Sequence, residues 1–245
     1  MKKNFILCTL IAALGLHNFA QAEIEFMYIL KEEEYRQVGN VAPTIPIGWV
    51  FGAGVQGDEN VTAATLTHPG PSSPVNLVDD LEIDVQDYTA QSFLDADYPN
   101  GNYSLNITDN GSAQNYGPFS ITGDTYPDPP HLLNPMALHS HDLSQDFTLL
   151  WAPFTGAGAS DEAFVQIWSN ETDNDVFFEF IDTSSTSILI PGGSLAANGS
   201  YEIGLTFVKE TDELQNVDTK VGYFASNYFE LDTSPQTFED PSVLV

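Results

Sequence analysis

The sequence predicts an all-β protein made of two tandem antiparallel Greek-key β-sandwich domains behind an export signal. One pattern (a leucine, a polar turn, Asn-Gly, one further residue, a tyrosine and an alternating strand) occurs twice, over 94–107 and 195–205. Its tyrosines, Tyr103 and Tyr201, lie 98 positions apart, which is about one β-sandwich domain. Short alternating apolar runs separated by Gly, Pro, Asn and Asp turns complete the prediction.

The first residues predict bacterial export. Lys2 and Lys3 precede an apolar run over 5–16, and Ala20-Gln21-Ala22 has the small-x-small form of a cleavage site. We therefore expect residues 1–22 to be a signal peptide and the processed chain to lie in the periplasm or outside the cell. Cys8 leaves with that peptide, which excludes disulfides, thiol catalysis and cysteine metal ligands. No later run is long and apolar enough to predict a membrane span.

The processed chain is strongly acidic. Loss of Lys2 and Lys3 leaves four basic and thirty-five acidic residues, a formal charge of −31. Such a surface repels nucleic acid and anionic lipid, so neither is an expected partner. Adaptation to salty surroundings explains the acidity, because salt screens the self-repulsion. Divalent-cation binding is the alternative explanation.

The first domain is predicted over 23–126 and its strands follow from alternating apolar residues. The expected strands cover 24–30, 48–55, 61–66, 77–85, 103–107 and 119–122, and residues 88–93 lead into the corner. Asn-Gly before Tyr103 tolerates the left-handed backbone of a tight turn. The tyrosine is typical of a tyrosine corner, in which the ring packs at the core edge and the hydroxyl bonds nearby backbone. Prolines in 124–130 then predict a semi-rigid joint.

The second domain is predicted over 127–235, and residues 236–245 are expected to form a C-terminal tail. A strand at 147–150 leads into a core tryptophan, Trp151. The further strands are expected at 163–168, 176–181, 187–190, 201–207 and 222–231.

Several motifs of this second domain are similar to those of fibronectin type III domains. They are Trp151-Ala152-Pro153, Ile190-Pro191-Gly192, Leu195 and Gly199-x-Tyr201, and the resemblance covers about 129–233. The first domain lacks the Trp-x-Pro signature and resembles only a generic immunoglobulin-like sandwich. The tandem also resembles secreted bacterial β-sandwich proteins of unknown role. The resemblance implies a fold and a tendency to bind or to space other modules, and it implies no reaction.

Three groups of residues are candidate metal ligands. His139 and His141 would point the same way on an extended strand and could share zinc or copper, although a third ligand is expected for a stable site. Asp95 and Asp97 resemble part of a calcium loop, but their spacing misses the EF-hand pattern. Asp124 and Asp128 at the joint could bind a calcium ion that stiffens it. We expect no cofactor overall, with calcium as the alternative. Exposed loops and turns are the alternative for all three groups.

Aromatic side chains offer a second kind of site. If Val165 and Ile167 face the core, then Phe164 and Trp168 face outward, and Phe177 could join them from the next strand. Such aromatics stack on sugars or form protein interfaces. A register shifted by one residue would make them core instead.

The sequence therefore favours an exported, non-catalytic binding, adhesion or spacer module whose partner is an extracellular polysaccharide or another surface protein. A calcium- or transition-metal-dependent binding protein is the main alternative. A hydrolase with an unrecognised site is the third, since no Gly-x-Ser-x-Gly, phosphate loop or His-Glu-x-x-His occurs.

Overall fold

The computed structural model describes residues 24–77, 81, 86–214 and 217–234. Within these residues nearly all regular structure is β-strand, which confirms the all-β class. The two exceptions there are short helices, α2 (Gln91–Asp97) and η1 (Pro135–Ser140). The predicted signal peptide, its cleavage site and the tail at 236–245 lie outside the described residues.

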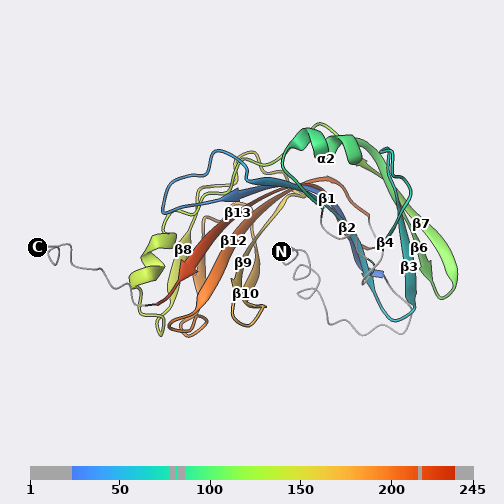
Figure 1. Ribbon diagram of the computed structural model, residues 1–245. Helices are drawn as coiled ribbons and strands as arrows, with labels where there is room; N and C mark the ends of the chain where they lie inside the picture. Colours follow the sequence, from blue (N-terminus) through green and yellow to red (C-terminus); the bar gives the residue numbers. More distant parts are fainter. Residues whose placement is uncertain (1–23, 78–80, 82–85, 215–216, 235–245) are drawn as a thin grey trace, which may run out of the picture.

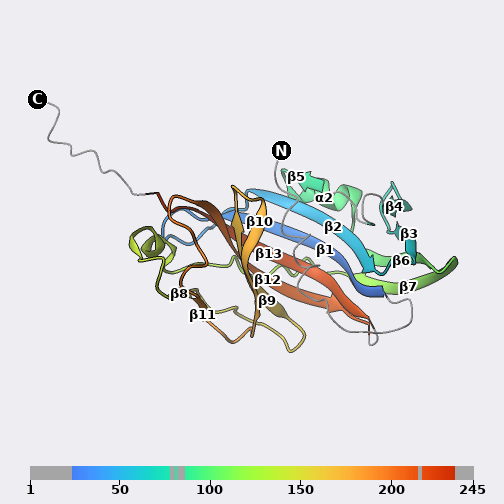
Figure 2. The same ribbon diagram turned by 90° about the horizontal axis from the view of Figure 1, so that it is seen from below.

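Three sheets hold the strands (Figures 1 and 2). The first has seven strands in the order β10 (Asn174–Ile181), β9 (Glu162–Ser169), β12 (Ser200–Asp212), β13 (Asp218–Asp232), β1 (Ile24–Arg36), β2 (Gly48–Gly57) and β5 (Gln86–Tyr88). The second has the order β4 (Val75–Leu77), β3 (Val61–Thr67), β6 (Gly101–Asp109) and β7 (Ser112–Ile121). The third pairs β11 (Ser187–Ile190) with β8 (Phe147–Leu150).

One strand pair at the centre of the seven-stranded sheet is parallel, whereas the sequence predicts two antiparallel domains in tandem. β1 runs parallel to β13, with Phe26 opposite Asp218 and Arg36 opposite Tyr228, while it pairs antiparallel with β2. Strands from both predicted domains therefore share one sheet. Local periodicity gives no sign of this, because alternation fixes which face a residue takes and not which strand lies beside it. The predicted domain boundary falls between β7 and η1 and stays a prediction.

Both main cores lie on the same face of the seven-stranded sheet. The four-stranded sheet covers one end, where Met27 and Ile29 pack with Phe51 and Tyr103. The two-stranded sheet covers the other end, where Trp151 and its neighbours pack against β9, β12 and β13. Figure 2 shows these two smaller sheets at opposite ends of the long one.

The repeated tyrosine pattern forms the predicted corners. The Tyr103 hydroxyl donates to the Pro99 carbonyl oxygen at 2.7 Å, and the Tyr201 hydroxyl accepts from the Ala196 N–H at 2.8 Å. Both rings are buried at the edge of a core. The two corners are thus confirmed as structural features, and their tyrosines fix the strand that follows each turn.

The buried side-chain amide of Gln37, directly after β1, is hydrogen-bonded to the segment before β8. The Gln37 Oε1 accepts from the Leu132 N–H and from Asn227 Nδ2, and its Nε2 donates to the Leu132 carbonyl oxygen. We expect Gln37→Leu to lower the free energy of unfolding by about 2 kcal/mol, because it leaves buried polar partners without hydrogen bonds. Urea unfolding checks this, with exposed Gln145→Leu as the control. Equal effects of the two changes would contradict it.

Candidate functional site

The face of the seven-stranded sheet opposite both cores carries the most unusual chemistry of the described chain. We call it the Phe/Glu face. On this face, side chains of β1 lie in register with side chains of β13. The pairs are Arg36 with Tyr228, Glu34 with Ser226, and Glu32 with Phe224. Towards β10 it continues through Thr206 and Val208 of β12 and Phe164 of β9. One half of this face is polar and the other is apolar.

The Phe/Glu face contains two of the three predicted aromatic residues, Phe164 in its apolar half and Trp168 beside Glu202. Phe164 lies on this face, as expected from Val165 and Ile167 in the second core, but it is only 1% exposed. It packs in a third cluster with Phe26, Tyr28, Leu30, Val208 and Phe224. Trp168 occupies the same face nearer the end of β9 and is half-buried.

Phe177 is corrected by the structure. The register between β10 and β9 shifts between Asp175 and Phe177, so Phe177 lies opposite Ile167 and packs against the second core. Phe178 and Phe180, instead of Phe177, lie beside Phe164, with ring centroids 5.5 and 6.0 Å from that of Phe164. A bulge inserts one residue and so reverses the faces that follow. The sequence of β10 shows no Gly or other signal for it.

The polar half concentrates carboxylates. Arg36 forms ion pairs with Glu202 and Glu230. Glu32 is 6% exposed and its Oε1 accepts from the Tyr228 hydroxyl at 3.3 Å. Burial, and then the charge of Glu34, raise the pKa of Glu32 from 4.5 to about 8. The sequence shows the acidic run at 32–34, but not that β1 buries part of it.

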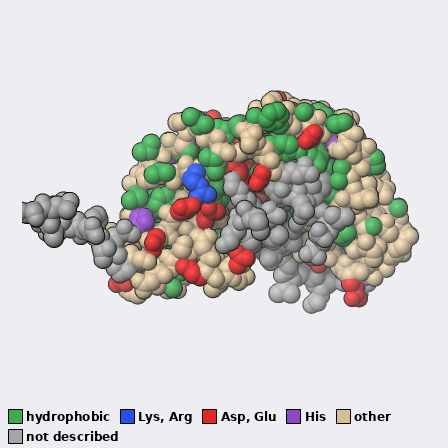
Figure 3. Space-filling view, viewed as in Figure 1, with side chains coloured by type: hydrophobic (Ala, Val, Ile, Leu, Met, Phe, Trp, Pro, Cys, Tyr) green, Lys and Arg blue, Asp and Glu red, His purple; other side chains and the backbone are tan. Residues whose placement is uncertain are grey.

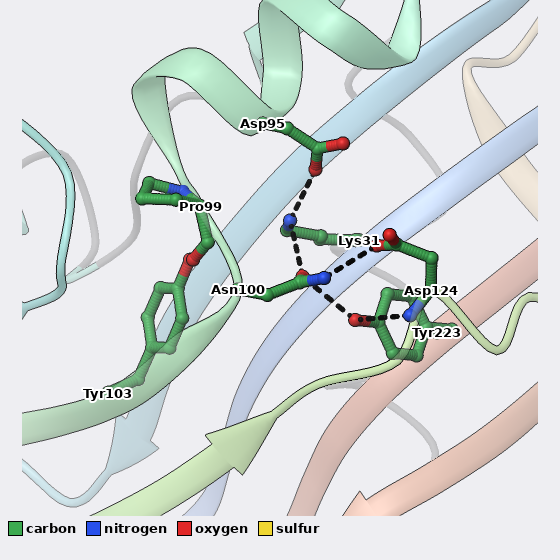
Figure 4. A network of polar contacts seen from close by, with 7 residues as sticks. All are labelled: Lys31, Asp95, Pro99, Asn100, Tyr103, Asp124 and Tyr223. Carbon is green, nitrogen blue, oxygen red and sulfur yellow. Dashed lines mark hydrogen bonds and ion pairs between the residues drawn. The ribbon is translucent and has the colours of Figure 1, made fainter.

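Asp95 and Asp124 belong to a polar network around the buried Lys31 side chain (Figure 4). The Lys31 ammonium, whose side chain is fully buried, donates to Asp95 Oδ1 at 2.6 Å and to Asn100 Oδ1 at 2.9 Å. Asn100 Nδ2 donates to Asp124 Oδ1 at 2.8 Å, and the Tyr223 hydroxyl donates to Asn100 Oδ1. The amine thus occupies the position between Asp95 and Asn100 that a bound cation would need.

The other predicted acids are not part of this network. Asp97 accepts a hydrogen bond from the Tyr88 hydroxyl at 3.1 Å, and Asp128 is exposed in the segment after β7. Calcium binding by Asp124 and Asp128 stays a prediction. In the part of the chain that the structure describes, no group of three or more His, Cys, Asp or Glu side chains could hold a metal ion.

The two histidines lie at a helix and not on an extended strand. His139 is in η1 and His141 is its C-cap, so the alternation that would aim both imidazoles the same way is absent there. His139 Nδ1 lies 3.0 Å from the Asp232 carbonyl oxygen, and His141 Nε2 lies 3.1 Å from that of Gln145. His139 lines a groove of about 240 Å³ with Arg36, Met136 and Phe229.

A serine and a histidine side chain lie close together in the first half of the chain, as a serine hydrolase site would require. Ser72 Oγ lies 3.3 Å from Nε2 of the buried His68. His68 Nδ1, however, accepts a hydrogen bond from the Gly70 N–H at 3.1 Å. In the neutral ring the proton is then on Nε2, which donates to Ser72 and cannot take its proton. Burial also lowers the pKa of His68, which keeps the ring neutral.

Comparisons with known proteins place few constraints on the chain. No family model matches it, and no curated protein matches it. Its similar solved structures include a two-domain fibronectin type III segment from chicken tenascin, at 11% identity over 87% of this chain and 100% of that one, with a TM-score of 0.29.

Two of the other similar structures come from a biofilm-associated protein and from an adhesin. The BSP domain of a biofilm-associated protein is 11% identical over 86% of this chain and 29% of that one, with a TM-score of 0.26. A bacterial ice-binding adhesin is 12% identical over 86% and 65%, with a TM-score of 0.27. None of the helices in the described ranges is long and apolar enough to cross a membrane.

Proposed function

We propose that the chain is an exported, non-catalytic binding or adhesion module. The observation that carries this proposal is that all four basic side chains of the described chain make contacts within the fold. Lys31, Arg36 and Lys220 each hold ion pairs with acids, and Lys209 donates to the Gly156 carbonyl oxygen. Groups that could position or stabilise a reacting anion are therefore engaged within the fold. The acidic side chains outside these ion pairs give the surface its negative charge.

The shared sheet supports the same proposal. Pairing of β1 with β13 joins the first and last described strands, and the Lys31 and Gln37 networks connect segments 64 to 190 positions apart. Many such contacts bind the chain into a stiff scaffold that presents sheet faces and edges. A scaffold of this kind suits recognition of an extended partner, such as a polysaccharide or a surface protein.

The processed chain, purified after export, provides the test. We expect saturable retention on at least one insoluble extracellular polysaccharide or immobilised surface protein, with the chain recovered intact and no soluble product released. Reducing-end and peptide-release assays on the same samples check for turnover. Release of product that scales with protein concentration would overturn the proposal and would favour the hydrolase alternative.

A further inference from the structure

The outer face of the four-stranded sheet has a composition unlike the rest of this acidic chain. One row of side chains crosses all four strands in register, namely Asn76, Thr65, Asn106 and Asn115. Asn102 and Thr108 flank the row along β6, on the same face. All six are exposed or half-exposed, whereas Leu66, Leu105 and Ile107 between them point into the first core. We call this surface the Thr/Asn face.

Strand propensity explains only part of this composition. The β-branched side chain of threonine is favoured in strands, but asparagine is depleted there. Four of the six residues are nevertheless asparagines. The Thr65 hydroxyl donates to Asn76 Oδ1 at 3.2 Å across β3 and β4, which gives Asn76 a structural role. Strand pairing does not call for asparagine at the other three positions, so a role in binding is the better explanation.

The Thr/Asn face is also free of charge. The register-matched outward positions of β3, β4, β6 and β7 hold Thr, Asn, Ser or Ala, although the processed chain has thirty-five acidic residues. In Figure 3 the end of the molecule formed by these strands is mostly tan, the colour of uncharged polar side chains and backbone. A charge pressed against a neutral surface loses hydration without gaining a partner. A face that meets a neutral ligand is therefore expected to exclude charges.

We propose that the Thr/Asn face binds a neutral, hydroxyl-rich polysaccharide, which deepens the proposed binding function and rests on it. Amide and hydroxyl groups both donate and accept hydrogen bonds, as sugar hydroxyls do. Neighbouring strands repeat these groups about every 4.8 Å. The face offers no aromatic ring for stacking, so the ligand must be extended and contact several rows at once. The ligand is expected to be neutral because the acidic remainder of the chain repels polyanions.

Charge reversal at the centre of the row tests this proposal. Asn106→Glu and Asn106→Lys introduce opposite charges at one exposed position, and both are expected to reduce retention on an insoluble neutral glucan or chitin at least tenfold. Thr148→Glu and Thr148→Lys, at an exposed position of β8, are the matched controls and are expected to bind as the unmodified chain does. Thermal unfolding of each variant separates lost binding from lost folding, and Asn106→Thr is expected to keep binding.

The possible results separate this proposal from the function on which it rests. Loss of retention in both Asn106 charge variants, at low and at high salt, supports the Thr/Asn face. Full retention in those variants, or retention of the unmodified chain only on charged polymers, overturns it and leaves a binding module that uses another surface. Absence of retention on every polysaccharide and surface protein would overturn the proposed function itself.

Discussion

Replacing Asp95 with alanine is expected to lower the free energy of unfolding by about 3 kcal/mol, because it leaves the Lys31 ammonium buried without its counter-ion. The Lys31 side chain is 0% exposed and that of Asp95 is 31% exposed. The partial exposure of Asp95 and the remaining bond to Asn100 place the effect at the lower end for a broken buried pair. Urea unfolding followed by tryptophan fluorescence measures it. Asp97→Ala, two residues away and exposed, is the control and should cost less than about 1 kcal/mol.

The double variant makes this test specific. Lys31→Met removes the buried charge with a side chain of similar length, so Lys31→Met/Asp95→Ala should be more stable than Asp95→Ala alone. Contacting residues that act as one network give such non-additive effects. Simple addition of the two single losses would show that the ion pair does not hold α2 against β1. A calcium-dependent rise in the melting temperature would instead favour the predicted acidic metal site.

The features that were predictable from the sequence are local ones. The Asn-Gly turn with its tyrosine two residues later predicts both corners, since turn and corner lie within six residues. Alternation in β9 predicts that Phe164 and Trp168 share a face. α2 escapes prediction, because its N-cap, Ala90, makes no side-chain hydrogen bond and Phe93 within it is 59% exposed.

The features that were not predictable depend on distant partners. Asp95 resembles part of a calcium loop, and nothing near it in sequence indicates that Lys31, 64 positions away, supplies the positive charge. The Glu32 environment requires β1 to lie beside β13, which pairs residues almost 200 positions apart. The sequence also gives no sign of the bulge that turns Phe177 toward the second core. Periodicity is a property of one strand, whereas these features belong to pairs of strands.

The stability of the chain is expected to fall as pH rises from 4.5 to about 8, because Glu32 binds its proton more tightly when folded. Burial is the main cause of the raised pKa, and the charges of Glu34 and Asp87 add to it, while hydrogen bonds from Ser226 and Tyr228 oppose it. Between these pH values the folded state holds more protons than the unfolded state, so stability decreases with pH. Each unit of pKa corresponds to about 1.4 kcal/mol, which gives a loss of up to about 5 kcal/mol.

Glu32→Gln isolates this contribution from that of the other acids. Burial also raises the pKa of Asp175 to about 6 and that of Glu210 to about 7, so both contribute to the slope in the unmodified chain. Glutamine keeps the shape and a hydrogen-bond acceptor for Tyr228 but cannot ionise. The variant should therefore match the unmodified chain at pH 5 and exceed it in stability at pH 9, as measured by urea unfolding at fixed ionic strength. Parallel stability curves for the two proteins would mean that Glu32 is ionised in the fold, with Arg36 or solvent compensating its charge.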